Sequence, residues 1–194
     1  MSSIPIFADE SWRLPSRGRV GMLSLIVGES GIFTIFVVAY IYYIGRSLSG
    51  PTAKILEVPI FNSICLLSSS VTIILAEHAI QHGFMRRFAA WWALTMLLGI
   101  EFLAGTAIEW RKLIFEDHLT IRTNLFGTTY YSLVGLHATH VIIGLIGLSL
   151  VMLFTLMGRV KQSHAERIQV LALYWHFVDA VWVVVFTVVY IVGR

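Results

Sequence analysis

Five long apolar stretches constrain this chain more than any other feature. They lie near positions 20–44, 58–80, 88–110, 128–157 and 169–192 of the 194-residue sequence. Each reaches the ~20 residues that a helix needs to cross a hydrocarbon core of ~30 Å. The chain is 57% hydrophobic and only 13% charged, with a mean hydropathy of +0.80, which excludes an ordinary soluble domain. The sequence therefore predicts an all-α integral membrane bundle of five transmembrane helices, with no soluble domain.

The first 19 residues contain arginines and prolines but no apolar core, so we expect an N-terminal cytoplasmic segment at 1–19 and a transmembrane domain at 20–194. No removable signal peptide is expected, because no small-residue cleavage site follows an apolar stretch. Loop cations favour a cytoplasmic N-terminus by eight to six. The eight are Arg13, Arg17, Arg19, Arg86, Arg87, Arg159, Lys161 and Arg167; the six are Arg46, Lys54, Arg111, Lys112, Arg122 and Arg194.

Composition also excludes several kinds of site. Cys65 is the only cysteine, so the chain can form neither an internal disulfide nor a cysteine-rich metal site. The formal charge of +3 comes from loop residues, which argues against nucleic-acid binding. Aromatic residues near the expected helix ends are interpreted as interfacial anchors, since their rings prefer the headgroup region. These are Trp91, Trp92, Trp110, Tyr42 and Tyr43.

Two of the apolar stretches carry buried carboxyl groups. Glu29 lies ~13 Å along the first helix from Val20 and is flanked by small residues, so another helix or a lipid can approach it closely. Three roles are open for the Glu29 carboxyl: helix packing, proton handling or lipid binding. Glu101, Gly105 and Glu109 recur every four residues on one face, which should point into protein. Glu109, near the helix end, is also expected to reach water.

Histidines mark the fourth and fifth stretches. His137 and His140 lie three residues apart and could ligate haem or a metal, but hydrogen bonding across helices is the favoured interpretation. His176 and Asp179 have the same spacing, so an imidazole and a carboxyl can meet on one helical face. Trp175 and Trp182 form a second stripe, which is more typical of packing than of a cofactor site. The residues alone indicate a membrane bundle with a polar seam.

Five motifs, taken together, resemble the cytochrome c oxidase subunit III family of haem-copper respiratory oxidases. They are RVGMLSLIVGES from Arg19, LEVPIFN from Leu56, EFLAGTAIEW from Glu101, FGTTYYSLVGLHATHVIIGL from Phe126 and ALYWHFVDAVWVVVFTVVY from Ala172. The motifs occur in the family's order across all five helices, and the resemblance covers nearly everything after residue 17. The chain looks like the five-helix bacterial form, beginning before the third of the seven helices in longer members.

The resemblance implies a non-redox accessory subunit of a proton-pumping terminal oxidase that reduces oxygen to water. Such subunits hold no metal or cofactor; haem and copper belong to the partner, subunit I. The helices hold phospholipid in a cleft and support stability and proton uptake. Other oxidase subunits, a respiratory supercomplex and membrane lipids are the implied partners. The implied location is the bacterial plasma (inner) membrane, crossed several times.

The site residues follow from the same resemblance. Glu29 matches the family's buried glutamate, whose role is lipid- or proton-associated. His140 matches the second histidine of a Gly-x-His-x-x-His pattern, and His176 and Asp179 match the Trp-His-x-x-Asp element of the last helix. His137 and Glu109 complete the set expected to be lipid- or proton-associated.

The chain also departs from the family in two places. It has Thr106-Ala107-Ile108-Glu109 where many members have Gln-Ala-x-x-Glu, and Glu77-His78 where many have paired histidines. Specific contacts at these points are therefore open.

Several functional alternatives remain open from sequence. The donor to the oxidase can be cytochrome c, favoured by frequency, or a quinol, and a related five-helix protein accompanies nitric oxide reductases. A small membrane cytochrome would use His137 or His140 with His78 or His176. A proton-coupled transporter would centre on Glu29.

Overall fold

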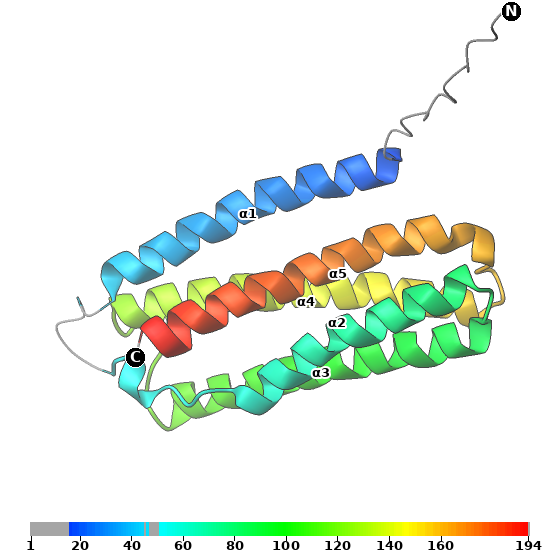
Figure 1. The fold of residues 1–194 in the computed structure, drawn as a ribbon. Helices are drawn as coiled ribbons and strands as arrows, with labels where there is room; N and C mark the ends of the chain where they lie inside the picture. Colours follow the sequence, from blue (N-terminus) through cyan, green and yellow to red (C-terminus); the bar gives the residue numbers. More distant parts are fainter. Residues whose placement is uncertain (1–15, 45, 47–50, 194) are drawn as a thin grey trace, which may run out of the picture.

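A computed structural model describes residues 16–44, 46 and 51–193, and five long helices make up most of these residues (Figure 1). They are α1 (Arg17–Tyr43), α2 (Ile60–Gln81), α3 (Met85–Phe115), α4 (Leu125–Leu156) and α5 (Ala165–Phe186). Short 3-10 turns, η1 (Ala53–Ile55) and η2 (Gln162–His164), precede α2 and α5. No strand occurs within these ranges, and all five helices are long and apolar enough to cross a membrane. The predicted all-α membrane bundle is confirmed.

Local chemistry sets the helix ends. Pro59 directly precedes α2, where its missing N–H costs nothing. Asn124 caps α4, its Oδ1 accepting from the Gly127 N–H at 2.8 Å. After α2 and α4, Gly83 and Gly158 adopt positive φ angles of 77° and 68°, which glycine reaches without strain. The expected N-terminal segment falls mostly outside the described residues, as do Arg13 and Arg194.

The helices differ in how deeply they enter the bundle. The hairpin of α2 and α3 packs most closely, and α5 touches α1, α2 and α4. Helix α1 packs mainly on α4 and α5, along one side of the bundle and away from α3 (Figure 1). It buries the smallest share of its apolar surface inside the chain. Most of α1 therefore faces lipid or a partner.

Buried indole groups in the core donate hydrogen bonds that join neighbouring helices. Trp175 and Trp182 on α5 are buried, and their N–H groups donate to Ser69 Oγ at 2.8 Å and Ser63 Oγ at 3.1 Å on α2. The interpretation of this stripe as packing is confirmed. Trp92 was predicted to anchor in the headgroup region, and this prediction is wrong. Its side chain is fully buried and donates to the Leu148 carbonyl at 2.9 Å, because its helix extends seven residues before it.

The last membrane segment ends in a π-helical turn, η3 (Thr187–Val192). Tyr190 in this turn is buried against α3 and α4, whereas Ile191 and Val192 are exposed. π-Helical turns are rare and are frequently found at functional sites.

Candidate functional site

Glu29 and His140 meet between α1 and α4. The Glu29 Oε2 lies 3.2 Å from His140 Nε2, and their side chains are 25% and 9% exposed. The other ring nitrogen, Nδ1, lies 2.8 Å from the Leu136 carbonyl, which can only accept a hydrogen bond. His140 Nδ1 therefore carries a hydrogen, and one proton is shared between His140 Nε2 and the Glu29 carboxyl. The expectation that His140 is hydrogen-bonded across helices is confirmed.

The surroundings of this pair are aromatic and apolar. The Phe33 ring lies 4.9 Å from the His140 ring, centre to centre, and the Tyr174 hydroxyl donates to the His140 carbonyl at 3.2 Å. Phe33 also lines a groove of about 300 Å³ between α1 and α5, together with Val37, Phe177 and Val181. A proton-sharing pair thus stands next to a groove with apolar walls.

His137 does not behave as expected. Its side chain is fully buried, and neither ring nitrogen has a hydrogen-bond partner among the described residues. The ring stacks on Trp182 at 4.9 Å and meets the edge of Phe102 at 5.7 Å. The prediction of hydrogen bonding across helices is therefore wrong for His137. His137 lies three residues before His140 on the same helix, but its ring faces the aromatic core instead of α1.

His176 and Asp179 were expected to meet directly, but Ser70 of α2 lies between them. The Ser70 hydroxyl donates to Asp179 Oδ2 and lies 3.1 Å from His176 Nδ1. The residue spacing within α5 does not predict a contact with Ser70, because Ser70 lies on α2. A run of three serines at 68–70, inside an otherwise apolar stretch, is the signal that could have found it.

Glu109 lies inside the bundle and was expected to reach water. Its Oε1 accepts from the hydroxyls of Tyr190 at 2.9 Å and Tyr130 at 3.2 Å. The carboxyl thus joins α3 to α4 and η3, and it is only partly accessible from outside. Sequence reasoning missed both tyrosines, which look like ordinary aromatic residues of a membrane helix.

Glu101 and Glu109 line one pocket of about 390 Å³ between α2 and α3, as their shared face predicts. The gap at Gly105 is filled by the Asn62 amide, so a Cβ there would come within 2.1 Å of Asn62 Nδ2. Lys112 and Glu57 form an ion pair beside this pocket.

Within the described ranges, no group of three or more histidine, cysteine, aspartate or glutamate side chains is arranged to hold a metal ion. Of the four histidines considered for haem, His137 faces the aromatic core and His140 faces Glu29, so these two do not point toward a common centre.

Comparison with known proteins agrees with this fold. The profile of the family described as Cytochrome c oxidase subunit III matches residues 16–194. Cytochrome c oxidase subunit 3 of Alkalihalophilus pseudofirmus is 31% identical over 177 residues, covering 90% of this chain and 86% of that protein. The protein of the same name from Thermostichus vulcanus is 31% identical over 193 residues, covering 97% and 94%. That of Xenopus laevis is 31% identical over 186 residues, covering 89% and 68%. The chain therefore belongs to the cytochrome c oxidase subunit III family and is, as its motifs predict, a subunit of a membrane-bound oxidoreductase complex.

Proposed function

We propose that this chain supports a proton-pumping haem-copper oxidase by holding lipid at the face formed by α1 and α5 and by keeping the complex competent for proton uptake. Its partner is the large subunit I, which carries haem and copper, and the electron donor is cytochrome c. The chain lies in the bacterial plasma membrane with its N-terminus in the cytoplasm.

The observation that carries this proposal is the pair of Glu29 and His140 beside the groove between α1 and α5. A shared proton keeps both side chains neutral or mutually compensated at a depth where an isolated charge is costly. The groove of about 300 Å³ is lined mainly by apolar side chains, and it suits an acyl chain better than a polar solute. Glu29 keeps a quarter of its side chain accessible, so a lipid headgroup or water can reach the pair.

Native mass spectrometry of the tagged chain, extracted in mild detergent, tests this function. Polypeptides, haem, copper and lipid are scored together in one spectrum. We expect a complex with a large subunit that carries haem and copper, and phospholipid that stays bound. The accompanying subunits identify the electron donor. Recovery of the chain alone with haem attached would contradict the proposal.

A second sample tests the lipid role separately from assembly. We expect Phe33→Trp, which fills the groove from α1, to leave the subunits assembled but to reduce the retained phospholipid. The matched control is Phe36→Trp, three residues along the same helix and outside the residues that line the groove. Equal lipid retention in the two variants would place the lipid elsewhere.

A further inference from the structure

Three side chains from two helices form one hydrogen-bonded row inside the bundle. Ser70 of α2 stands between His176 and Asp179 of α5. Asp179 is 3% exposed, and His176 is half-buried. The row therefore runs from a partly accessible imidazole to a carboxyl in the core.

The number of available hydrogens determines which group donates in each of the two hydrogen bonds. Ser70 has one hydroxyl hydrogen, which it donates to Asp179 Oδ2. The contact of 3.1 Å between Ser70 Oγ and His176 Nδ1 must then be donated by the imidazole, because the serine has no second hydrogen. His176 is consequently protonated on Nδ1. The order is His176 N–H to Ser70 O–H to Asp179.

The inner end of the row has room for one more hydrogen. Asp179 Oδ1 is buried and has no hydrogen-bond partner in the part of the chain that the structure describes. Ser69 is a neighbour of Asp179, but its hydroxyl hydrogen goes to the Leu66 carbonyl at 2.6 Å and its oxygen accepts from Trp175. A proton delivered to Asp179 Oδ2 can be donated back to Ser70 Oγ, whose own hydrogen then points to His176 Nδ1. The protonated carboxyl thus keeps Ser70 as its partner.

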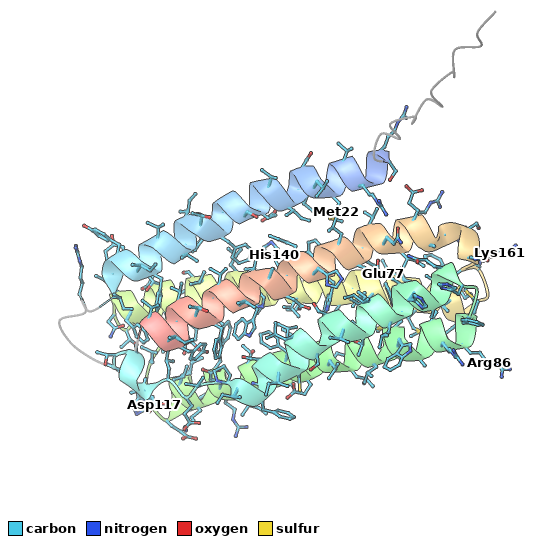
Figure 2. The ribbon with its side chains drawn as sticks, in the orientation of Figure 1. Met22, Glu77, Arg86, Asp117, His140 and Lys161 are labelled. Carbon is cyan, nitrogen blue, oxygen red and sulfur yellow. The ribbon has the colours of Figure 1, made fainter. Side chains whose placement is uncertain are left out.

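The outer end of the row borders a polar pocket. His176 lines a pocket of about 520 Å³, together with Arg19 and Leu23 of α1, Glu77 of α2, and Gln169 and Leu173 of α5. Arg19 is exposed and donates to Gln169 Oε1 at 2.6 Å. Figure 2 shows Glu77 at this level, between α2 and α5, in the half of the bundle that contains Met22 and the end marked by Lys161 and Arg86. A pocket of this size, with charged and polar side chains among its lining residues, has room for water.

We infer that His176 and Ser70 form a proton relay that loads Asp179 from this pocket. Water in the pocket gives a proton to His176 Nε2. The imidazolium passes its Nδ1 proton to Ser70 Oγ while the serine hydroxyl proton moves to Asp179 Oδ2. The imidazole is left with its proton on Nε2, Ser70 again has one hydrogen, and Asp179 becomes a neutral carboxylic acid. Reversal of the same steps returns the proton to the pocket.

Two charged side chains of opposite sign line the pocket beside His176, Arg19 on α1 and Glu77 on α2. At the inner end, the neighbours of the Asp179 carboxyl are Ser69 and Ser70, neither of which carries a charge. The accessible charges thus act on the entrance of the relay, and the core end is neutral unless Asp179 itself ionises.

This inference rests on the proposed function, because a proton-exchanging carboxyl has a use in a subunit that assists proton uptake. The pocket lies at the end of the bundle that holds the start of α1, which is the cytoplasmic end in the proposed orientation. The relay makes a claim about proton exchange at one residue, and this claim can be measured without reference to oxidase turnover.

Infrared difference spectroscopy of the reconstituted complex, purified through this chain, is the decisive experiment. We expect a carboxylic C=O band that disappears in Asp179→Asn and shifts when the sample is moved from H₂O to D₂O. In Ser70→Ala the band should remain, but its hydrogen–deuterium exchange should slow by about 100-fold, the scale on which a positioned proton-transfer group acts. Ser70→Thr keeps the hydroxyl and should restore the parent rate.

Ser63→Ala is the matched control. Ser63 is also a serine of α2 that is hydrogen-bonded to α5, but its partners are the buried Trp182 indole and the Pro59 carbonyl instead of Asp179. Exchange at the parent rate in Ser70→Ala, equal slowing in Ser63→Ala, or a spectrum unchanged by Asp179→Asn would each overturn the relay. Oxygen turnover measured on the same samples judges the proposed function separately. If Ser70→Ala slows hydrogen–deuterium exchange at Asp179 but leaves oxygen turnover normal, the relay is supported and its proposed contribution to proton uptake is contradicted.

Discussion

The Tyr190 hydroxyl donates to Glu109 Oε1 at 2.9 Å, which joins the end of the chain to the last two turns of α3. A regular continuation of α5 would place Tyr190 on the face of Val183, seven residues earlier, and Val183 is 48% exposed. The π-helical turn over Thr187–Val192 brings Tyr190 inward instead, where it is 3% exposed. The irregular turn therefore occurs where the half-buried Glu109 carboxyl accepts a hydrogen bond from Tyr190.

Removing that donor should loosen the end of the chain. We expect Tyr190→Phe to lower the free energy of unfolding by about 0.6 kcal/mol, the average for hydrogen bonds between membrane helices, and by no more than about 1.7 kcal/mol, the largest value. Amide exchange over Thr187–Val192 should rise, since the π turn loses the contact that favours it. Hydrogen–deuterium exchange read by mass spectrometry checks this. Tyr43→Phe, at the end of α1 and away from Glu109, is the control, and equal exchange in the two variants would contradict the argument.

A side chain at Gly105 requires the Asn62 amide to move. A Cβ at this position would lie 2.1 Å from Asn62 Nδ2, and the half-buried Asn62 side chain must turn away, so Gly105→Ala should destabilise the chain by about 1 kcal/mol, the low end of the cost of overpacking. Gly21→Ala is a matched change on α1, where a Cβ meets nothing within 4 Å, and it should be neutral or slightly stabilising. Thermal unfolding in detergent compares the two. Combining Gly105→Ala with Asn62→Ala should recover part of the loss; no recovery would mean that the clash lies elsewhere.

The indole of Trp175 depends on Ser69. Ser69→Ala leaves the buried Trp175 N–H without its acceptor, which should cost about 1–3 kcal/mol of unfolding free energy. Ser24→Ala provides the comparison, because Ser24 is exposed on α1 and donates only to the Val20 carbonyl of its own helix. Chemical unfolding monitored by tryptophan fluorescence measures both. Identical midpoints would show that the indole has found another acceptor.

Glu29 should affect how long the oxidase works more than how fast it starts. In Glu29→Ala, His140 Nε2 loses its partner, so the support of α1 against α4 and of bound lipid weakens during turnover. We expect early oxygen-consumption rates close to the parent and late rates that fall several-fold sooner. Glu29→Gln, which keeps the shape and a hydrogen-bond donor, should lie between the two. Immediate and complete loss of activity in an intact complex would rule this out.

The sequence predicted the architecture well because the membrane imposes it. A helix that crosses the hydrocarbon must be long and apolar, so the five stretches could be read directly, and their bounds lie within a few residues of the observed ones. The pairing of Glu29 with His140 was not visible, because no spacing rule connects residues on α1 and α4. Family resemblance pointed to both residues, and only the fold brings them together.

Other contacts were missed because the periodicity of one helix says nothing about its neighbour. His176 and Asp179 share a face, as predicted, but the position of α2 decides that Ser70 stands between them. Trp92 was assigned to the interface because α3 was expected to begin at residue 88, whereas it begins at Met85 and extends one turn further in both directions. Errors of a single turn change whether a tryptophan faces headgroups or core.

The packing of α1 on α4 and α5 affects the order in which the bundle assembles during synthesis. Among the five helices, α1 is synthesised before α4 and α5, on which it mainly packs, and the α2–α3 hairpin is made in between. Helix α1 therefore exists before the helices that it contacts most. Helix α1 is strongly apolar and little buried inside the chain, which is compatible with contact with lipid before the other helices pack. Glu29 can pair with His140 only after α4 has packed against α1.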